Sequence, residues 1–235
     1  MRAYAALPPA ARALVESAHR RECAVRWVLD SNRLEHCGTQ DLGSTRAALL
    51  RATAGRSLPE SETIATMVAL ELLFARLAEK RDEVGRGAER EERLDALLQT
   101  VDGILELHGA LLAHEGVGGG RAGTYRTGDA HPGDAPRSLY CTPSRIETEL
   151  YAAVDAHNSA VRALAASGDA AACAPSSAVG VGARLLHAML RVHPFGDGNG
   201  RLARLVIADA SVGLWTGVRL EVERAGFVWP EFEKE

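Results

Sequence analysis

Twelve consecutive residues, from His193 to Arg204, bring together side chains that could do chemistry as a group. The run reads His-Pro-Phe-Gly-Asp-Gly-Asn-Gly-Arg-Leu-Ala-Arg. It combines an imidazole that titrates near neutral pH with one carboxylate, three glycines, one amide and two guanidinium groups. Strongly apolar segments lie on both sides of it. This composition predicts a functional site between two buried helices.

The run lies where one predicted helix ends and the next begins. Apolar residues recur at helical spacing over residues 183–192, and Pro194 then disfavours helical geometry at His193. The apolar pattern resumes after the run, so a second helix is predicted to begin at Asn199 or Gly200. The first N–H groups of a helix have no acceptor within it, and such an end binds anions. An anion site is therefore expected at this junction.

The two arginines make the anion hypothesis more specific. Arg201 and Arg204 lie in the first turn of the second helix, where the helix dipole makes a cation unfavourable by roughly 0.3–1 kcal/mol. A bound polyphosphate would offset them, because guanidinium groups match phosphate oxygens and glycine lets the backbone approach closely. Asp197 would then share a Mg²⁺ ion with the phosphates. His193 is the group that could take up a proton near neutral pH.

Other interpretations fit these residues less well. A structural histidine, a flexible glycine turn and a solvated pair of arginines are each common, but their coincidence at one junction is much less so. Asp197 and Asn199 begin like an EF-hand loop, yet Arg201 takes its fifth position and Ala208 its twelfth, where a glutamate is needed. The glycines lack the pattern of a P-loop or a dinucleotide fingerprint, and no HExxH motif is present.

The run resembles the signature of the Fic-domain family, HPFx(D/E)GNGRxxR, at every fixed position. The resemblance implies an all-α helical bundle with a small β-hairpin flap. It also implies transfer of AMP from ATP, with Mg²⁺, to a Ser, Thr or Tyr hydroxyl of a target protein. His193 would deprotonate that hydroxyl, Asp197 would hold Mg²⁺, and Phe195 would anchor the loop in the core. The resemblance assigns five residues to the nucleotide phosphates: Gly198, Asn199, Gly200, Arg201 and Arg204.

A second motif lies near the N-terminus. In Ser31-Asn-Arg-Leu-Glu35-His36 a hydroxyl and a carboxylate are four residues apart, hence on one face of a helix. The pattern resembles the autoinhibitory (S/T)xxxE(G/N) helix that many Fic proteins carry before the core. The resemblance implies that Glu35 pairs with Arg204 and displaces the γ-phosphate of ATP from its productive position. His36 departs from the usual Gly or Asn, but histidine tolerates left-handed geometry better than most residues.

Two other functions stay open. In some relatives the same glutamate positions water, so the chain could remove AMP from a protein, or transfer another nucleotide or phosphate-containing group. Gly198 and Gly200 disfavour the kinase-like branch of the family, which has Lys in place of the second glycine. The other alternative is a non-catalytic binding module in which Arg201 and Arg204 sense ATP for a partner. The intact His193 disfavours it, because a pure binder needs no base.

Helical segments are predicted to position these residues. Besides the two that flank the run, they are expected over residues 9–35, 61–76, 94–113 and 146–165. Residues 42–56 are expected to be a mixed polar stretch, residues 79–93 a solvated connection, and residues 166–182 a loop.

A glycine- and proline-rich region, residues 116–143, could hold two short strands at 123–126 and 139–140, in the place where Fic proteins carry the flap. Such a flap would align the main chain of the target by strand addition. We predict an N-terminal helical segment with the inhibitory motif over 1–40 and a Fic-like helical domain over 41–235, together in one compact unit.

Composition indicates an ordinary globular chain. Its 235 residues are 46% hydrophobic and 25% charged, and the net charge of −4 predicts neither nucleic-acid nor membrane binding. No apolar run approaches the ~20 residues of a transmembrane helix, and the first residues lack a secretory signal. Four cysteines without CxxC spacing indicate reduced thiols. We therefore expect a cytoplasmic monomer or homodimer whose partner is a target protein with a hydroxyl acceptor.

Overall fold

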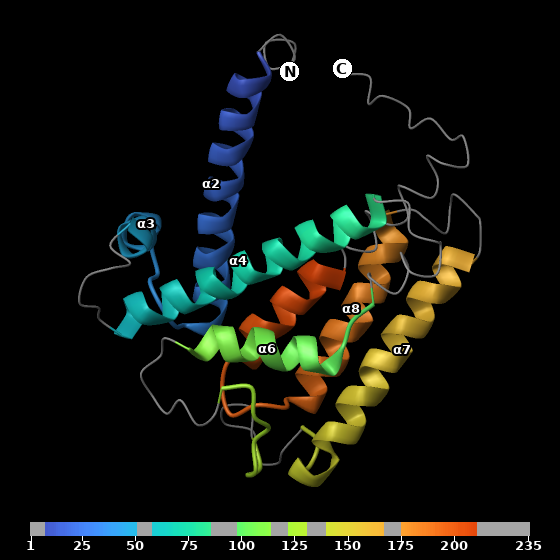
Figure 1. The fold of residues 1–235 in the computed structure, drawn as a ribbon. Coiled ribbons are helices and arrows are strands. Elements are labelled where there is room, and N and C mark those ends of the chain that lie inside the picture. The colour runs from blue at the N-terminus through green and yellow to red at the C-terminus, as the bar shows by residue number, and fades with distance from the viewer. Residues whose placement is uncertain are drawn as a thin grey trace.

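The computed structural model describes residues 8–50, 58–85, 98–113, 122–130, 140–166 and 175–210 (Figure 1). Its named helices are α2 (Pro9–Glu35), α3 (Leu42–Leu50), α4 (Leu58–Gly85), α6 (Val101–Leu112), α7 (Ile146–Ala166) and α8 (Pro175–Val192), with a 3-10 turn, η1 (Pro143–Arg145), before α7. A further helix covers residues 199–210. The described residues contain no strand, so the predicted all-α class is confirmed.

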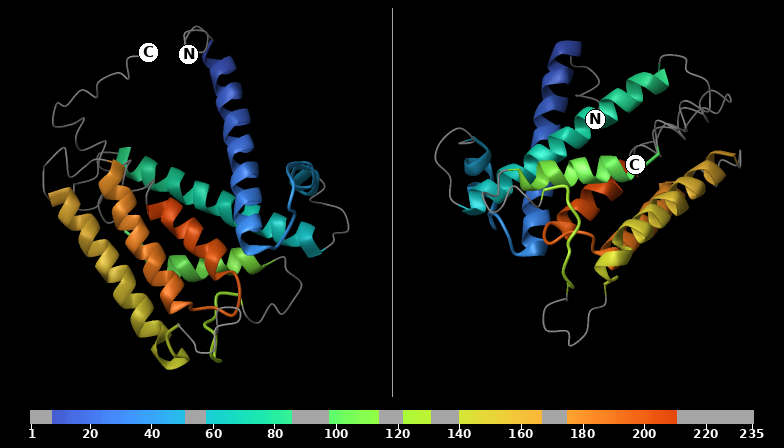
Figure 2. Two further views of the ribbon diagram at one scale, coloured as in Figure 1. Left: turned by 180° about the vertical axis from the view of Figure 1, so that it is seen from behind. Right: turned by 60° about the horizontal axis from the view of Figure 1, so that its bottom comes forward.

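The helices pack around the helix at residues 199–210. α7 and α8 lie side by side and run in opposite directions, while α4 packs against α6 and α3 (Figures 1 and 2). The C-terminal end of α2 reaches α3 and α4, and the N-terminal half of α2 projects away from the other helices. This arrangement places the end of α2 beside the start of the helix at 199.

The core explains why the helix at 199–210 is central. Leu202, Ala203, Leu205 and Val206 are fully buried, so side chains on more than one of its faces are covered by other helices. The partners in this cluster come from every other large helix: Ala24 and Val28 of α2, Leu70 and Leu73 of α4, Ile104, Leu107 and Leu111 of α6, Ile146 and Leu150 of α7, and Leu185 and Met189 of α8. The site at the start of the central helix thus rests on the main hydrophobic core.

Local side-chain chemistry sets several helix ends. Thr100 accepts a hydrogen bond from the backbone N–H of Gly103 at 3.0 Å, so it caps the start of α6. Asp41 accepts one from the N–H of Ser44 at 2.8 Å and starts α3 in the same way. At the end of α2, His36 adopts φ 53° and ψ 31°, the left-handed geometry that closes many helices.

The structure corrects four predicted boundaries. The stretch at 42–56 contains α3, because the Asp41 cap and the burial of Ala48 stabilise a helix that composition does not reveal. α4 continues to Gly85, since Glu, Lys and Arg are good helix formers even where no apolar face is needed. α8 begins at Pro175, a favoured first residue, so part of the expected loop is helical. Residues 98–100 are not helical, because the Thr100 cap starts α6 later than expected.

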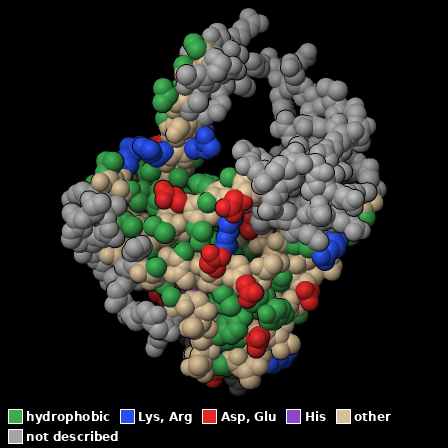
Figure 3. Space-filling model, in the orientation of Figure 1, with side chains coloured by type: hydrophobic (Ala, Val, Ile, Leu, Met, Phe, Trp, Pro, Cys, Tyr) green, Lys and Arg blue, Asp and Glu red, His purple; other side chains and the backbone are tan. Residues whose placement is uncertain are grey.

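The predicted flap is not shown by the structure. Residues 122–130 form turns and extended backbone without a strand, and residues 131–139 lie outside the described residues. Among the described helices, none has the length and the apolar character needed to cross a membrane. Cys23, Cys37 and Cys141 are free thiols. On the face seen in Figure 3, the described Arg side chains lie in separate small groups, with acidic and hydrophobic side chains between them.

Candidate active site

The end of α8 places His193 at the centre of the site. The N–H of His193 still donates to the carbonyl of Met189 at 2.8 Å, but His193 itself has φ 48°. This left-handed conformation ends the helix and turns the chain toward Phe195. Phe195 is completely buried, and its ring stacks on that of His108 with 3.7 Å between centroids. His193 and the buried Phe195 therefore come from one sharply turned segment.

Asn199 closes the loop that follows. Its side-chain oxygen accepts from the N–H of Phe195 at 3.0 Å, and its side-chain nitrogen donates to the carbonyl of Phe195 at 2.8 Å. Gly198 lies at φ 74°, and a Cβ there would meet a methyl carbon of Leu111 at 3.1 Å, so a larger residue would be strained. The N–H of Leu202 then makes the first bond of the new helix, to the carbonyl of Gly198 at 2.9 Å.

The new helix begins at Asn199, as predicted from the sequence. Because the first intrahelical bond is donated by Leu202, the N–H groups of Asn199 and Gly200 have no acceptor within the helix. They point out of the helix start beside a loop held rigidly by the Asn199 side chain. The geometry therefore supplies a preorganised end at which an anion can bind.

His108 holds this loop through a hydrogen bond to Asp197 and a ring contact with Phe195, a role that the sequence analysis did not identify. The N–H of Gly123 donates to His108 Nδ1 at 3.0 Å, so Nδ1 must be the acceptor nitrogen. The proton is therefore on Nε2, which donates to the carbonyl of Asp197 at 3.1 Å. Burial lowers the pKa of His108 to about 4, which keeps the ring neutral and both hydrogen bonds intact at neutral pH.

Arg126 is a second contributor that the sequence analysis missed. It is 9% exposed, and its guanidinium donates to the carbonyls of His193 at 2.7 Å, Gly128 at 2.7 Å and Cys141 at 2.5 Å. Its own N–H donates to the carbonyl of Pro194 at 2.9 Å. One side chain thus holds the backbone of His193 against two other segments. A single arginine in a glycine-rich stretch carries no sequence signal for such a contact.

The ring of His193 lies half-buried against Tyr140, with 3.9 Å between ring centroids and 13° between planes. Burial is the main cause that lowers the pKa of His193, and the nearby Arg126 charge lowers it further. The carboxylates of Glu35 and Asp197 act in the opposite direction. The lowered pKa favours a neutral imidazole at pH 7, the form that can accept a proton.

Asp197, in the loop before the helix, and Arg201, in the first turn of the helix, differ greatly in exposure. Arg201 is 2% exposed, and its guanidinium comes within 3.8 Å of Asp197 Oδ1, while the Asp197 side chain is 73% exposed. No cluster of three His, Cys, Asp or Glu side chains within the described residues could hold a metal ion alone. An exposed single carboxylate beside an anion site fits Mg²⁺ that takes its other ligands from phosphates and water.

Arg204 is held entirely by α2. Its Nη1 donates to Glu35 Oε1 at 2.9 Å, its Nε to the hydroxyl of Ser31 at 3.1 Å, and its Nη2 to the Ser31 carbonyl at 3.1 Å. All three guanidinium nitrogens therefore have acceptors on one helix. The structure brings together the two N-terminal residues and the distant arginine that the sequence analysis linked.

Gly200 shows how close the carboxylate of Glu35 comes to the helix start. A Cβ built on Gly200 would lie 2.0 Å from Glu35 Oε1 and 2.9 Å from Oε2, far inside contact distance. Only glycine leaves room for the carboxylate at this place. Glu35 thus sits as an internal anion against the first turn of the helix at 199, where both the amide ends and Arg204 attract negative charge.

Comparisons with known proteins agree with this geometry. Residues 98–209 match the model of the Fic/DOC family. A Fic domain containing signaling protein from Bacteroides thetaiotaomicron has a similar structure, with TM-score 0.62, 23% identity, and coverage of 89% of this chain and 68% of that one. Fic-1 from C. elegans is also similar, with TM-score 0.56 and 23% identity over 90% of this chain.

This chain spans 58% of the length of that Fic-1 chain. A substituted form of Fic-1 is similar as well, with TM-score 0.50 and 22% identity, and the match covers 92% of this chain and 66% of that one. No curated protein matches the sequence. The family match spans the complete run from His193 to Arg204, and these solved structures share the fold. Residues 98–209 of this chain therefore match the Fic/DOC family, and the chain shares the fold of these Fic structures.

Proposed function

We propose that this chain is a protein adenylyltransferase that is restrained by Glu35. In the proposed reaction, the oxygen of a Ser, Thr or Tyr hydroxyl attacks the α-phosphorus of ATP. The bond between the α-phosphorus and the bridging oxygen to the β-phosphate breaks, and pyrophosphate leaves. His193 takes the hydroxyl proton, so the products are an AMP ester on the target protein, pyrophosphate and a proton.

The observation that carries the proposal is the position of a half-buried histidine next to a rigid, anion-binding helix start. His193 has a lowered pKa, and the amides of Asn199 and Gly200, which have no acceptor within their helix, lie a few residues further along the chain. Charge that develops on phosphate oxygens during the attack would meet fixed N–H groups and the buried Arg201. Fic proteins generally transfer nucleotide or other phosphate-containing groups onto proteins, which supports this reaction class.

Asp197 is the residue that we propose to hold Mg²⁺, together with phosphate oxygens of ATP. The ion would neutralise part of the phosphate charge and orient the triphosphate. The exposed carboxylate of Asp197 supports this assignment, since one carboxylate plus phosphates is a common magnesium environment. Arg201, buried behind it, would fix the orientation of the Asp197 side chain.

We propose that Glu35 restrains the enzyme by occupying the place of a phosphate. Its carboxylate contacts Gly200 and pairs with Arg204, the two groups that a γ-phosphate would otherwise approach. Ser31 supports the restraint by holding the other guanidinium nitrogens of Arg204. A chain with Glu35 in this position would bind the triphosphate poorly, or with its α-phosphorus out of line for attack.

Label transfer from ATP tests the proposal. The wild type, Glu35→Gly and the double variant Glu35→Gly/His193→Ala are incubated with Mg²⁺ and either α-labelled or γ-labelled ATP. We expect α-label on protein, stronger in Glu35→Gly and lost when His193 is also replaced, because a positioned base contributes about 10²–10⁴-fold. Label from the γ-position would show phosphoryl transfer instead. Equal α-labelling of wild type and Glu35→Gly would refute the restraint.

Removal of AMP is a second candidate, favoured by the position of Glu35 itself. Its carboxylate lies against the helix start, where it could also orient a water toward a bound AMP ester. In that case Glu35→Gly would lose activity instead of gaining it. A target protein that already carries labelled AMP distinguishes the two candidates: release of label by the wild type, but not by Glu35→Gly, would favour removal.

A further inference from the structure

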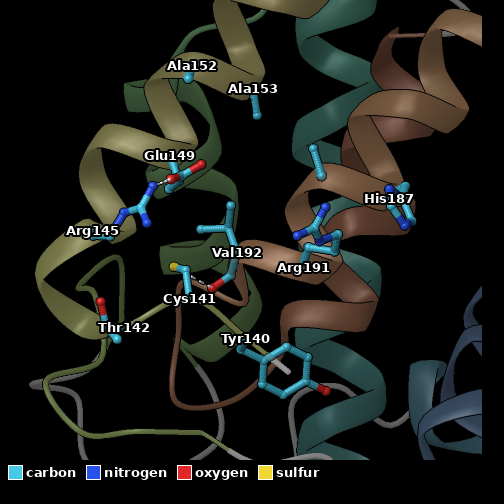
Figure 4. A pocket seen from close by; sticks show the side chains of 11 residues that line it. Tyr140, Cys141, Thr142, Arg145, Glu149, Ala152, Ala153, His187, Arg191 and Val192 are labelled. Carbon is cyan, nitrogen blue, oxygen red and sulfur yellow. Dashed lines mark hydrogen bonds and ion pairs between the residues drawn. The ribbon is translucent and has the colours of Figure 1, made fainter. Parts of the chain in front are cut away.

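A groove between α7 and α8 adjoins the proposed active site and has no role in the reaction described above. It encloses a cavity of about 620 Å³. Figure 4 shows Arg145 of η1 and Glu149 of α7 on one side of it, α8 on the other side with His187 and Arg191, and the segment 140–142 at one end. Small side chains line the rest and leave it wide: Ala152, Ala153 and Ala188.

The charges in the groove do not balance. Arg145, at the end of η1, forms an ion pair with Glu149 in the first turn of α7, so these two charges offset each other. Arg191 makes no ion pair within the described residues, and it is exposed at the C-terminal end of α8. His187 lies one turn before it on the same helix face. The groove therefore favours an anionic occupant.

The groove shares a wall with the His193 site. The ring of Tyr140 lines the groove and also stacks on the ring of His193. The N–H of Cys141 donates to the carbonyl of Arg191 at 3.3 Å, so the segment 140–142 is attached to the end of α8 just before the base. Whatever lies in the groove is consequently next to the place where an acceptor hydroxyl would meet His193.

We infer that this groove binds an acidic side chain of the target protein, close in sequence to the hydroxyl that receives AMP. The inference rests on the proposed function and adds a substrate class to it. An extended chain advances about 3.3 Å per residue, so an acidic residue about two to four positions from the acceptor can pass Tyr140 and reach Arg191. The guanidinium of Arg191 would pair with the carboxylate, and the alanines leave space for the side chain.

A peptide experiment tests this inference. Peptides with one serine and either glutamates or lysines at the flanking positions are incubated with α-labelled ATP, Mg²⁺ and the Glu35→Gly variant. We expect acidic peptides to be labelled with a kcat/KM about fivefold higher, the size of one ion pair at an open site. Arg191→Glu should remove or reverse that preference. Arg184→Glu is the matched control, because it makes the same charge change on an exposed part of α8 outside the groove.

Peptide binding measured by fluorescence anisotropy separates the inference from the proposed function. If no peptide and no protein carries α-label, the proposed function fails, and binding decides the role of the groove. Tighter binding of acidic peptides that is lost in Arg191→Glu and kept in Arg184→Glu supports the inference. Equal labelling or binding of acidic and basic peptides overturns it. The inference is also overturned if Arg191→Glu behaves like Arg184→Glu. It is overturned as well if the protein binds free phosphate but not acidic peptides.

Discussion

Replacing Ser31 with alanine should make the protein less stable but better at binding ATP. The Ser31 hydroxyl is buried and accepts a hydrogen bond from Arg204 Nε at 3.1 Å. Hydrogen bonds to charged groups contribute about 1.5–3 kcal/mol. Arg204 keeps some contact with solvent, since its side chain is 23% exposed, so we expect a loss of about 1–1.5 kcal/mol. The Ser31 carbonyl would still hold Nη2.

This loss would act on the equilibrium between bound and released Arg204. With RT near 0.59 kcal/mol, about 1–1.5 kcal/mol changes that equilibrium roughly 5–13-fold. If most wild-type molecules have Arg204 bound to α2, the fraction of molecules whose Arg204 can receive a phosphate rises by about the same factor. The apparent Kd for ATP with Mg²⁺ should therefore fall several-fold. The same loss of about 1–1.5 kcal/mol should lower the melting temperature by roughly 2–6 °C.

Isothermal titration with ATP and Mg²⁺ is the assay, with His193→Ala as the background so that turnover does not interfere. Ser159→Ala is the matched control, because Ser159 is exposed on α7. Opposite signs for stability and ATP affinity would support the competition between α2 and nucleotide for Arg204. A variant that melts at a lower temperature but binds ATP as weakly as its background would refute it.

Three further changes test other parts of the site. Burial lowers the pKa of His108 from 6.5 to about 4, so between these pH values the unfolded chain binds more protons. The free energy of unfolding should thus fall by roughly 3 kcal/mol as pH drops through that window. Denaturant unfolding at pH 4 and pH 7 should show a smaller difference in the free energy of unfolding for His108→Gln than for the wild type. An equal difference in the two proteins would contradict the lowered pKa of His108. Arg126→Lys keeps the charge but loses the planar fork that reaches three carbonyls, so labelling kinetics should show kcat at least about tenfold lower; an unchanged kcat would exclude a positioning role. His36→Gly relieves a left-handed conformation, so thermal unfolding should show about 0.5–1 kcal/mol more stability, and a loss would count against strain at this residue.

The sequence was enough to predict where the central turn lies. Pro194 ends one helix, the glycines allow the turn, and the renewed apolar pattern starts the next helix at Asn199. These are local effects, each readable within a few residues. The position of Glu35 four residues after Ser31 was equally local, and the resemblance to a known motif supplied its distant partner, Arg204.

Contacts that cross the fold could not be predicted in the same way. Arg126 reaches the carbonyl of His193 from 67 residues away, and His108 reaches Asp197 from 89 residues away. Arg126 belongs to no motif, and the helical spacing that places His108 on the buried face of α6 does not identify its partner, so only the packing of the helices reveals these contacts. The short helix α3 was missed for a related reason. Its stability depends on the Asp41 cap and on contact with α4, which composition alone does not report.

The complete engagement of Arg204 by one helix has a thermodynamic consequence. A guanidinium cannot serve two sets of acceptors at once, so α2 docking and the proposed phosphate binding at this residue would be reciprocally coupled. Any partner that binds the undocked α2 would raise the affinity of the protein for nucleotide. Nucleotide would raise the affinity of the protein for that partner by the same factor. Through one side chain, the level of ATP and the occupancy of the N-terminal helix would each report on the other.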